Sequence, residues 1–152
     1  MRPPRRPRGF TMVELLVVVA LFAIAAGAVS FALHDGSAAR LERDAARLAA
    51  LLESARAEAR ASALPVRFEV ASADAADRAQ FRFVGLPPSS KLPQRFLDDE
   101  VTAEVVGARA LVLGPEPLLP AQRVVLALGE RRLVLATDGL APFAPLAAEG
   151  AQ

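Results

Sequence analysis

The chain has 152 residues, which suits one globular domain with a long anchor rather than several domains. It contains no cysteine, so an exported domain of this chain would be held together by its core alone. Four of the 18 basic residues lie within the first eight positions, and the rest of the chain carries 14 against 17 acidic residues. This net charge of −3 argues against a general polyanion-binding surface.

The N-terminal segment joins an arginine-rich leader to a long apolar run. The leader ends at Gly9, Phe10 follows it, and Glu14 is the first carboxylate of the chain. The uncharged apolar run at residues 15–33 begins directly after Glu14. A carboxylate at the head of a membrane span costs about 2.5–3.5 kcal/mol on insertion scales, so we expect a group that pairs with it. Cleavage between Gly9 and Phe10 would create such a group, a new α-amino terminus.

A close resemblance to the class III leader of type IV pilins and type II secretion pseudopilins lies in residues 9–17, GFTMVELLV. In that family a prepilin peptidase cuts after the glycine on the cytoplasmic side and N-methylates the new first residue. The glutamate then pairs with the N-terminus of a neighbouring subunit in a helical filament. The resemblance implies that Gly9 ends the leader, Phe10 is the methylated N-terminus and Glu14 is the assembly carboxylate.

Two other interpretations fit parts of the same segment. A simple transmembrane anchor would also place arginines before an apolar run, although it rarely tolerates an acidic residue directly before that run. A Sec signal peptide would be cut after its apolar core. The triplets Ala23-Ile24-Ala25 and Ala26-Gly27-Ala28 resemble such a cleavage site, which keeps this alternative open.

The apolar run has the length of one membrane crossing. The bilayer core is about 30 Å thick and a helix rises about 1.5 Å per residue, so roughly 20 residues suffice. The leader arginines place the N-terminus in the cytoplasm by the positive-inside rule. We therefore expect a leader at residues 1–9, a transmembrane helix at 10–33 in the bacterial inner membrane, and a periplasmic remainder.

The segment that follows is predicted to be an amphipathic helix. Between residues 38 and 63, apolar positions recur every three or four residues: Leu41, Ala45, Leu48, Leu52, Ala55 and Ala59. Two i,i+3 ion pairs, Asp44–Arg47 and Glu53–Arg56, are expected along it. No proline interrupts the chain between the leader and Pro65, so residues 34–64 are predicted to continue the anchor helix into the head.

Beyond residue 65 the apolar pattern changes to a period of two, which is typical of strands. Strands are predicted at residues 66–70, 81–83, 101–106, 110–113, 123–128 and 133–137. A polar turn is expected at 72–78, a hairpin turn at Gly129-Glu130, and an irregular tail at 141–152. A long N-terminal helix followed by antiparallel hairpins predicts an α+β, type IV pilin-like fold with an antiparallel β-sheet head at residues 65–152.

The whole layout resembles the H-type minor pseudopilins of type II secretion, the GspH family. The resemblance includes residues 120–126, PAQRVVL, and residues 136–143, ATDGLAPF. It implies a low-copy subunit near the tip of the periplasmic pseudopilus, which helps drive export of folded proteins across the outer membrane. The implied partners are a prepilin peptidase, other minor pseudopilins and the major pseudopilin, and no nucleic acid is expected. Many pilins carry a C-terminal disulfide loop, which this chain cannot form.

A FimT-like minor type IV pilin, acting in pilus assembly or DNA uptake, is the main alternative. That role would need exposed arginines, and Arg131-Arg132 is the only adjacent basic pair after the leader. Beside Glu130 in a predicted hairpin, the pair fits a solvated strand end better. A major pseudopilin is a weaker alternative, because the calcium-binding loop of that family needs more carboxylates than Asp138 and Glu149.

No catalytic, cofactor or metal site is predicted. The only histidine, His34, lies beside Asp35 at the expected membrane exit, where a polar interfacial boundary explains the pair better than catalysis. The acidic run at residues 98–100 alternates sides before a strand, so its carboxylates do not converge on a cation. We therefore expect a protein that is not an enzyme.

Overall fold

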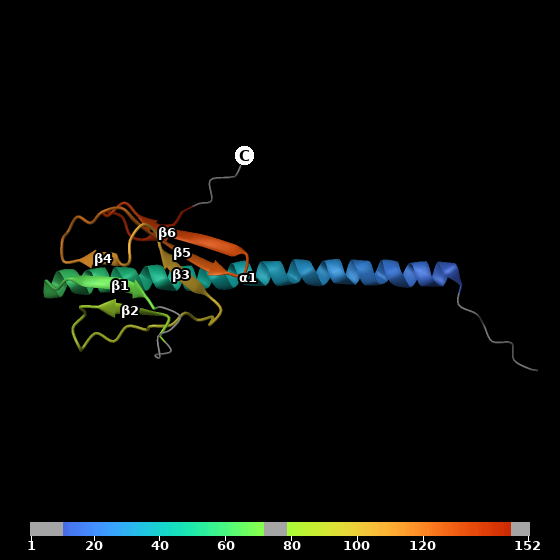
Figure 1. Ribbon diagram of the computed structural model, residues 1–152, viewed down its shortest axis with the longest axis horizontal. Helices are drawn as coiled ribbons and strands as arrows, with labels where there is room; N and C mark the ends of the chain where they lie inside the picture. Colours follow the sequence, from blue (N-terminus) through green and yellow to red (C-terminus); the bar gives the residue numbers. More distant parts are fainter. Residues whose placement is uncertain (1–10, 72–78, 147–152) are drawn as a thin grey trace, which may run out of the picture. The chain divides into compact units, whose positions relative to one another are not determined.

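The computed structural model describes residues 11–71 and 79–146, and within these the chain forms one helix and seven strands (Figure 1). The side chains of residues 26–35 are outside this description. The chain divides into two compact units, Met1–Gly36 and Ser37–Gln152. Helix α1, Met12–Ser62, contributes residues to both units.

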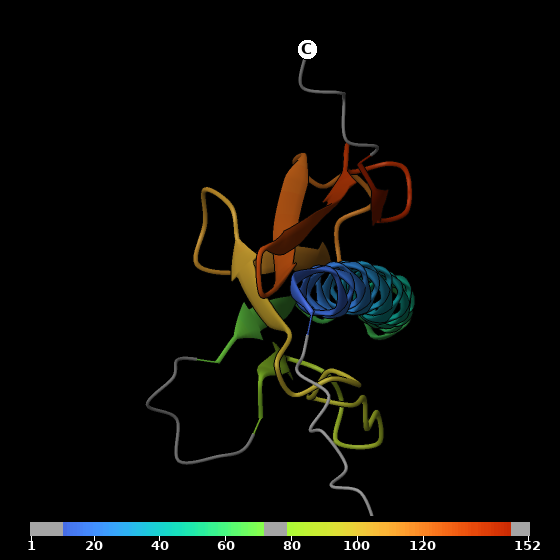
Figure 2. The same cartoon turned by 90° about the vertical axis from the view of Figure 1, so that its right-hand side faces the viewer.

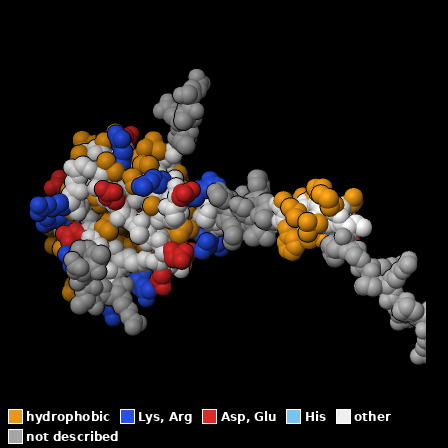
Figure 3. Space-filling model, turned by 45° about the vertical axis from the view of Figure 1, so that its right-hand side comes forward, with side chains coloured by type: hydrophobic (Ala, Val, Ile, Leu, Met, Phe, Trp, Pro, Cys, Tyr) orange, Lys and Arg blue, Asp and Glu red, His pale blue; other side chains and the backbone are white. Residues whose placement is uncertain are grey.

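In the first unit, the described part of α1 exposes apolar side chains on all sides. Leu15, Leu16, Leu21, Phe22 and Ile24 are each between 59% and 72% exposed. In the space-filling view, apolar side chains cover this part of the helix (Figure 3). An exposed apolar surface of this kind marks a site of association with protein or membrane.

The transmembrane helix predicted at residues 10–33 stays a prediction. Its residue 10, and the side chains of 26–33, lie outside the described residues. Among the residues that the structure describes, no helix is long and apolar enough to cross a membrane.

In the second unit, α1 buries the predicted apolar face. All six positions predicted for it are at most 3% exposed: Leu41, Ala45, Leu48, Leu52, Ala55 and Ala59. They join one core with inward-facing strand residues that include Val66, Phe68, Leu111, Leu126 and Leu135. Burial of this stripe, rather than helix propensity alone, fixes which face of α1 meets the strands.

The C-terminus of α1 ends in a Schellman-type cap. The Leu64 N–H donates to the Ala59 carbonyl at 3.2 Å, and Ala63 adopts a left-handed conformation with φ 55°. Pro65 disfavours helical geometry at Leu64, so the chain leaves the helix here, as predicted. An alanine occupies the position where glycine is the least strained residue.

Three strands form the first sheet, in the order β2–β1–β4 and antiparallel throughout. They are β1 (Val66–Val70), β2 (Phe81–Val84) and β4 (Leu111–Gly114). Four phenylalanine rings, Phe68, Phe81, Phe83 and Phe96, contact one another with centroid separations of 4.9–6.0 Å. These aromatic pairs stabilise the β1–β2 face and hold the loop that carries Phe96.

Four strands form the second sheet, in the order β3–β5–β6–β7 and also antiparallel. They are β3 (Thr102–Val105), β5 (Gln122–Leu128), β6 (Arg131–Thr137) and β7 (Ala144–Pro145). The predicted Gly129-Glu130 turn joins β5 to β6, with Gly129 at φ 58°. Viewed end-on to the helix, the strands curve around one flank of α1 from β6 to β2 (Figure 2).

The α+β class, the antiparallel pairing and the strand positions predicted from the sequence are confirmed. Two expectations need correction. The strands divide between two sheets, where the sequence pattern had pointed to one. Part of the tail predicted to be irregular forms β7, because the Leu146 N–H donates to the Val134 carbonyl at 2.8 Å and extends the pairing on β6. The predicted turn at 72–78 and the tail residues 147–152 lie outside the described residues.

We predict that Ala63→Gly stabilises the second unit, because glycine adopts the left-handed conformation without steric conflict. The free energy of unfolding should rise by about 0.5–1 kcal/mol. Ala57→Gly, at an exposed position within the same helix, should lower it by about 1 kcal/mol. Urea unfolding of the isolated unit Ser37–Gln152, followed by circular dichroism, measures both. If both variants lowered the free energy of unfolding by the same amount, the left-handed cap assigned to Ala63 would be contradicted.

Candidate functional site

The N-terminal motif enters the structure at Thr11. The Thr11 Oγ1 accepts a hydrogen bond from the Glu14 N–H at 3.2 Å, and the Thr11 carbonyl accepts one from the Leu15 N–H at 3.2 Å. Thr11 is therefore the N-cap of α1, and Glu14 lies in its first turn. Gly9 and Phe10, the predicted cleavage and methylation sites, lie outside the described residues.

The assembly role predicted for Glu14 stays a prediction. Its side chain is exposed, and among the described residues no ion pair engages it. A carboxylate in a first helical turn is also stabilised by the free N–H groups there. The Thr-x-x-Glu spacing is the signature of a capping box, and this signal in the sequence predicts the start of α1 at Thr11.

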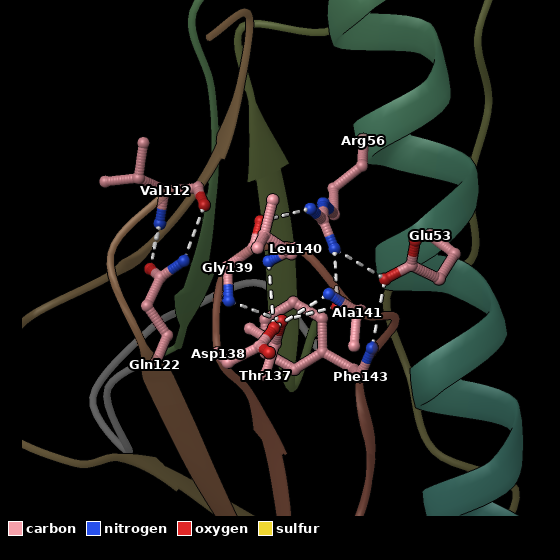
Figure 4. A network of polar contacts seen from close by, with 10 residues as sticks. All are labelled: Glu53, Arg56, Val112, Gln122, Thr137, Asp138, Gly139, Leu140, Ala141 and Phe143. Carbon is pink, nitrogen blue, oxygen red and sulfur yellow. Dashed lines mark hydrogen bonds and ion pairs between the residues drawn. The ribbon is translucent and has the colours of Figure 1, made fainter. Parts of the chain in front are cut away.

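A buried guanidinium attaches the turn after β6 to α1 (Figure 4). Arg56 is only 2% exposed. It donates to the Gly139 carbonyl at 3.0 Å, to the Ala141 carbonyl at 3.2 Å and to Glu53 Oε1 at 3.1 Å. The predicted Glu53–Arg56 pair is thus confirmed, but its role is larger than that of a surface ion pair. Its Nε is buried and has no partner among the described residues.

The turn itself is fixed by its own side chains. Thr137 Oγ1 donates to the Ala141 carbonyl at 2.6 Å and accepts from the Gly139 N–H at 2.9 Å. Asp138 Oδ1 accepts from the N–H groups of Leu140 at 2.9 Å and Ala141 at 2.7 Å. These short-range bonds are those that threonine and aspartate favour in turns.

Only glycine fits at position 139, because the backbone conformation and the close approach of a neighbouring carbonyl both exclude a side chain. Its φ is +98°, and a Cβ on this residue would lie 1.8 Å from the Leu119 carbonyl oxygen. The turn therefore packs directly against the loop that precedes β5. On its other side, the Phe143 N–H donates to Glu53 Oε1 at 3.1 Å, and the Phe143 ring is buried. The segment between β6 and β7 is consequently held on both sides.

The pKa of Asp138 is lowered, chiefly by the N–H groups of Ala141 and Leu140 that bind its carboxylate. Because the folded pKa lies below the unfolded value, the ionised carboxylate stabilises the fold at neutral pH. That contribution is lost as the pH falls through the folded pKa.

A second polar cluster attaches the loop before β3. Asp44 is 1% exposed, and its two oxygens accept from the N–H groups of Leu97 at 2.7 Å and Asp98 at 3.2 Å. The predicted Asp44–Arg47 pair is wrong, because the buried carboxylate is satisfied by backbone donors from a distant loop. Arg47 instead donates to the Arg95 carbonyl at 3.4 Å.

Gln80 supports the same loop from the first sheet. Its Oε1 accepts from the Phe96 N–H at 2.7 Å, and its Nε2 donates to the carbonyls of Asp99 at 3.1 Å and Val101 at 3.3 Å. The acidic run at residues 98–100 lies within this loop. Two of its carboxylates form ion pairs with arginines, Asp98 with Arg40 at 2.9 Å and Asp99 with Arg95 at 2.6 Å.

Arg131 and Arg132 are exposed at the first two positions of β6, next to the hairpin turn. In the described part of the chain, no cluster of three or more histidine, aspartate or glutamate side chains is arranged to hold a metal ion. The side chains of His34 and Asp35, and all of Glu149, lie outside the described residues.

Comparison with known proteins identifies the N-terminal segment. The prokaryotic N-terminal methylation motif matches residues 4–30, a range that contains Gly9, Phe10 and Glu14. No curated protein and no solved structure matches the chain. The motif is that of type IV prepilins and supports a pilin-like class for the chain. This class implies processing by a prepilin peptidase and anchoring in a membrane through the N-terminus.

We predict that Arg56→Ala destabilises the second unit by about 2–3 kcal/mol, because the buried Gly139 carbonyl loses its donor. Arg60→Ala is the matched control, since Arg60 is an exposed arginine on the same helix and should change stability by less than about 0.5 kcal/mol. Urea unfolding of both variants gives the two values. Similar small losses of stability in both variants would show that the hydrogen bonds of Arg56 to the turn after β6 contribute little.

We predict that Asp138→Asn lowers the urea midpoint at pH 7. The difference from the unsubstituted chain should shrink below about pH 4, where the aspartate of the unfolded chain becomes protonated. Glu130→Gln, on the exposed hairpin turn, serves as the control substitution. A difference that stays constant from pH 7 to pH 2.5 would mean that the ionised carboxylate does not stabilise the turn.

Proposed function

We propose that this chain is a minor pseudopilin of a type II secretion system, of the H type. It would be a low-copy subunit near the tip of the periplasmic pseudopilus that helps to export folded proteins across the outer membrane. The observation that carries the proposal is the methylation motif at residues 4–30, followed by an α+β head in which the second half of α1 packs on antiparallel strands. The absence of cysteine, and so of a disulfide-closed loop, favours a pseudopilin over a surface pilin.

The proposed mechanism is assembly rather than catalysis, without a cofactor or metal. The leader holds the precursor in the inner membrane with its N-terminus in the cytoplasm. Cutting after Gly9 creates an ammonium group on Phe10, and Glu14 of a neighbouring subunit attracts it. At membrane depth such a pair is much stronger than in water, but desolvation offsets a large part of the gain. We therefore assign to Glu14 the selection of register between subunits.

The head would supply specificity for its neighbours. The loop before β3 and the turn after β6 are fixed to α1 through Asp44 and Arg56, so the surfaces they carry are formed before any partner binds. Surfaces fixed in advance lose less conformational entropy on association. Other minor pseudopilins and the major pseudopilin are the proposed partners.

A FimT-like minor pilin is the second candidate. The observation that favours it is a set of exposed arginines on the second sheet, Arg123, Arg131 and Arg132. Arg123 and Arg132 lie opposite small residues, Ala136 and Ala127, in the strand register. Such a surface could contact nucleic acid phosphates.

We predict that the mature chain begins at Phe10 with an N-methylated amino group. Intact-mass measurement of the protein purified from membranes gives the first residue and the added methyl group together. A bulky residue in place of Gly9 should block cutting, since the peptidase must accept the residue directly before the cleaved bond. A mature N-terminus after residue 25 or 28 would instead identify a Sec signal peptide.

We predict that Glu14→Ala leaves processing and the head intact but lowers co-purification with other pseudopilins by about tenfold, which corresponds to roughly 1.4 kcal/mol. Glu42→Ala is the matched control, because Glu42 is an exposed carboxylate on the same helix. Unchanged co-purification in Glu14→Ala would remove the assembly role.

The same purified chain distinguishes the two candidate systems. A secretion subunit should retain other pseudopilins and show no DNA mobility shift at moderate salt. Salt-sensitive DNA binding that is lost in Arg131→Ala/Arg132→Ala, without any pseudopilin bound, would support the DNA-uptake pilin instead.

A further inference from the structure

The outer edge of β2 is covered at one end only. Residues opposite each other on antiparallel strands alternate between hydrogen-bonded and non-bonded pairs. The Ala71 N–H donates to the Gln80 carbonyl at 3.0 Å, which makes this pair a hydrogen-bonded one. By the alternation, Phe81 and Phe83 direct their backbone groups away from β1. The Gln94 carbonyl accepts from the Phe81 N–H at 3.2 Å, but among the described residues no hydrogen bond engages the backbone of Phe83 on this side.

An apolar hollow adjoins this open position. Phe83 lines it on one side, and the loop after β2 forms its other walls around a volume of about 260 Å³. Two of these walls, Leu86 and Leu92, pack against the core of the head, as Phe83 does. Pockets that hold drug-sized ligands measure about 300–1,000 Å³, so this hollow is better matched to a single side chain.

Lys91 gives the hollow an unopposed positive charge. Residues 79–97, which contain β2 and most of the loop after it, carry three basic residues and no carboxylate. The Arg82 guanidinium pairs with Glu69 at 2.9 Å. Arg95 pairs with Asp99 at 2.6 Å. Lys91 is exposed at the hollow, and within the described part of the chain it forms no ion pair.

We propose that the edge of β2 at Phe83 and the hollow beside it bind an extended segment of a partner subunit, which carries an apolar residue and, close to it, a carboxylate. The segment would add to β2 as a further antiparallel strand. A residue directly opposite Phe83 in such a pair exchanges both backbone hydrogen bonds with it and points its side chain to the same face. Its apolar side chain therefore reaches the hollow, and the carboxylate neutralises Lys91.

The site is separate from the other surfaces discussed above. Both views show β2 and the loop after it on the opposite side of α1 from β5 and β6 (Figures 1 and 2). The identity of the partner as another pseudopilin rests on the proposed function, whereas the site itself does not. One strand position and one side chain form a small interface, so a free peptide should bind weakly. A partner held in the same assembly has a much higher effective concentration.

Hydrogen exchange of the Phe83 amide tests the site in the full-length chain, held in lipid nanodiscs. The chain has eight phenylalanines, so labelling them with nitrogen-15 gives few amide signals. Without ligand, the Phe83 amide should exchange at least about tenfold faster than those of Phe81 and Phe96, which donate to Gln94 and Gln80. The probe is the capped hexapeptide Thr-Val-Asp-Leu-Thr-Val. At four times its dissociation constant it should leave about one fifth of the sites free and slow Phe83 exchange about fivefold.

Two altered peptides separate the backbone contribution from the charge contribution. N-methylation of the leucine amide removes the donor to the Phe83 carbonyl and should abolish the slowing of exchange. Lysine in place of the aspartate should weaken binding severalfold, because it meets Lys91. The variant Lys91→Glu should restore binding of this lysine peptide, whereas Arg67→Glu, which changes an exposed charge on β1, should not.

The hollow is tested by filling it. Ser90→Trp places a bulky ring at a lining position and should raise the dissociation constant of the hexapeptide at least about tenfold. Ser89→Trp is the matched control, because Ser89 is an exposed neighbouring serine outside the lining. Unchanged exchange of the Phe81 and Phe96 amides in both variants would show that the head is folded.

Co-purification from membranes connects the site to the proposed function. Ser90→Trp should lower the retention of other pseudopilins severalfold relative to Ser89→Trp. Peptide binding without any pseudopilin retained by the unsubstituted chain would support the site and remove the proposed function. Equal retention by both variants, together with no effect of the peptide on Phe83, would overturn the site and leave the proposed function standing.

Two further results would overturn the proposal in favour of another occupant. The first is slow exchange of Phe83 in the free chain that becomes fast when residues 147–152 are removed, which would identify the chain's own C-terminal segment. The second is slow exchange that becomes fast when the protein is diluted, which would identify a second copy of the chain.

Discussion

The close approach of the strands to α1 is the constraint on which the head depends. Ala45, Ala55 and Ala59 are fully buried, and these small side chains let backbone come near the helix. A Cβ on Gly114 would lie 2.9 Å from the Ala59 Cβ, so even one additional methyl group at this crossing would force a shift. In packing as dense as this, a small increase in side-chain volume shifts the neighbouring residues because no free space accommodates it. The small residues at this contact, Ala59 on α1 and Gly114 on β4, therefore determine how closely the first sheet packs on the helix, in addition to the burial of apolar surface.

Two buried polar side chains fix segments that the apolar stripe does not. The stripe on α1 packs against the strands, but it does not order the loop before β3 or the turn after β6. Asp44 and Arg56 do so from positions beside the stripe, one accepting backbone N–H groups and the other donating to backbone carbonyls. Buried charged groups of this kind are tolerable only because each is bonded to several partners. The loop before β3 and the turn after β6 are consequently fixed to α1 by buried hydrogen bonds.

The elements of the fold could be predicted because their signals are local. The three- and four-residue spacing on α1, the alternation in the strands and the turn residues Gly129-Glu130 each occupy a short window. The polar clusters could not be predicted in the same way. Asp44 and Arg56 bind groups that are 53 and 83 or more positions away in the chain, and local charge spacing offered nearer partners. The candidate site at the N-terminus shows the same division. Its motif was recognisable from residues 9–17, whereas the proposed partner of Glu14 is a group of another molecule, which the chain's own sequence does not contain.

The side chain of Gln122 has a consequence for how the head behaves in a crowded compartment. Its amide accepts from the Val112 N–H at 2.6 Å and donates to the Val112 carbonyl at 2.9 Å, so β5 covers the outer edge of β4 with one residue (Figure 4). An open strand edge is a template for uncontrolled pairing with other chains. Here a single amide takes the place of a neighbouring strand at that edge. The head is thereby protected against strand pairing with other chains at Val112, on one border of its first sheet.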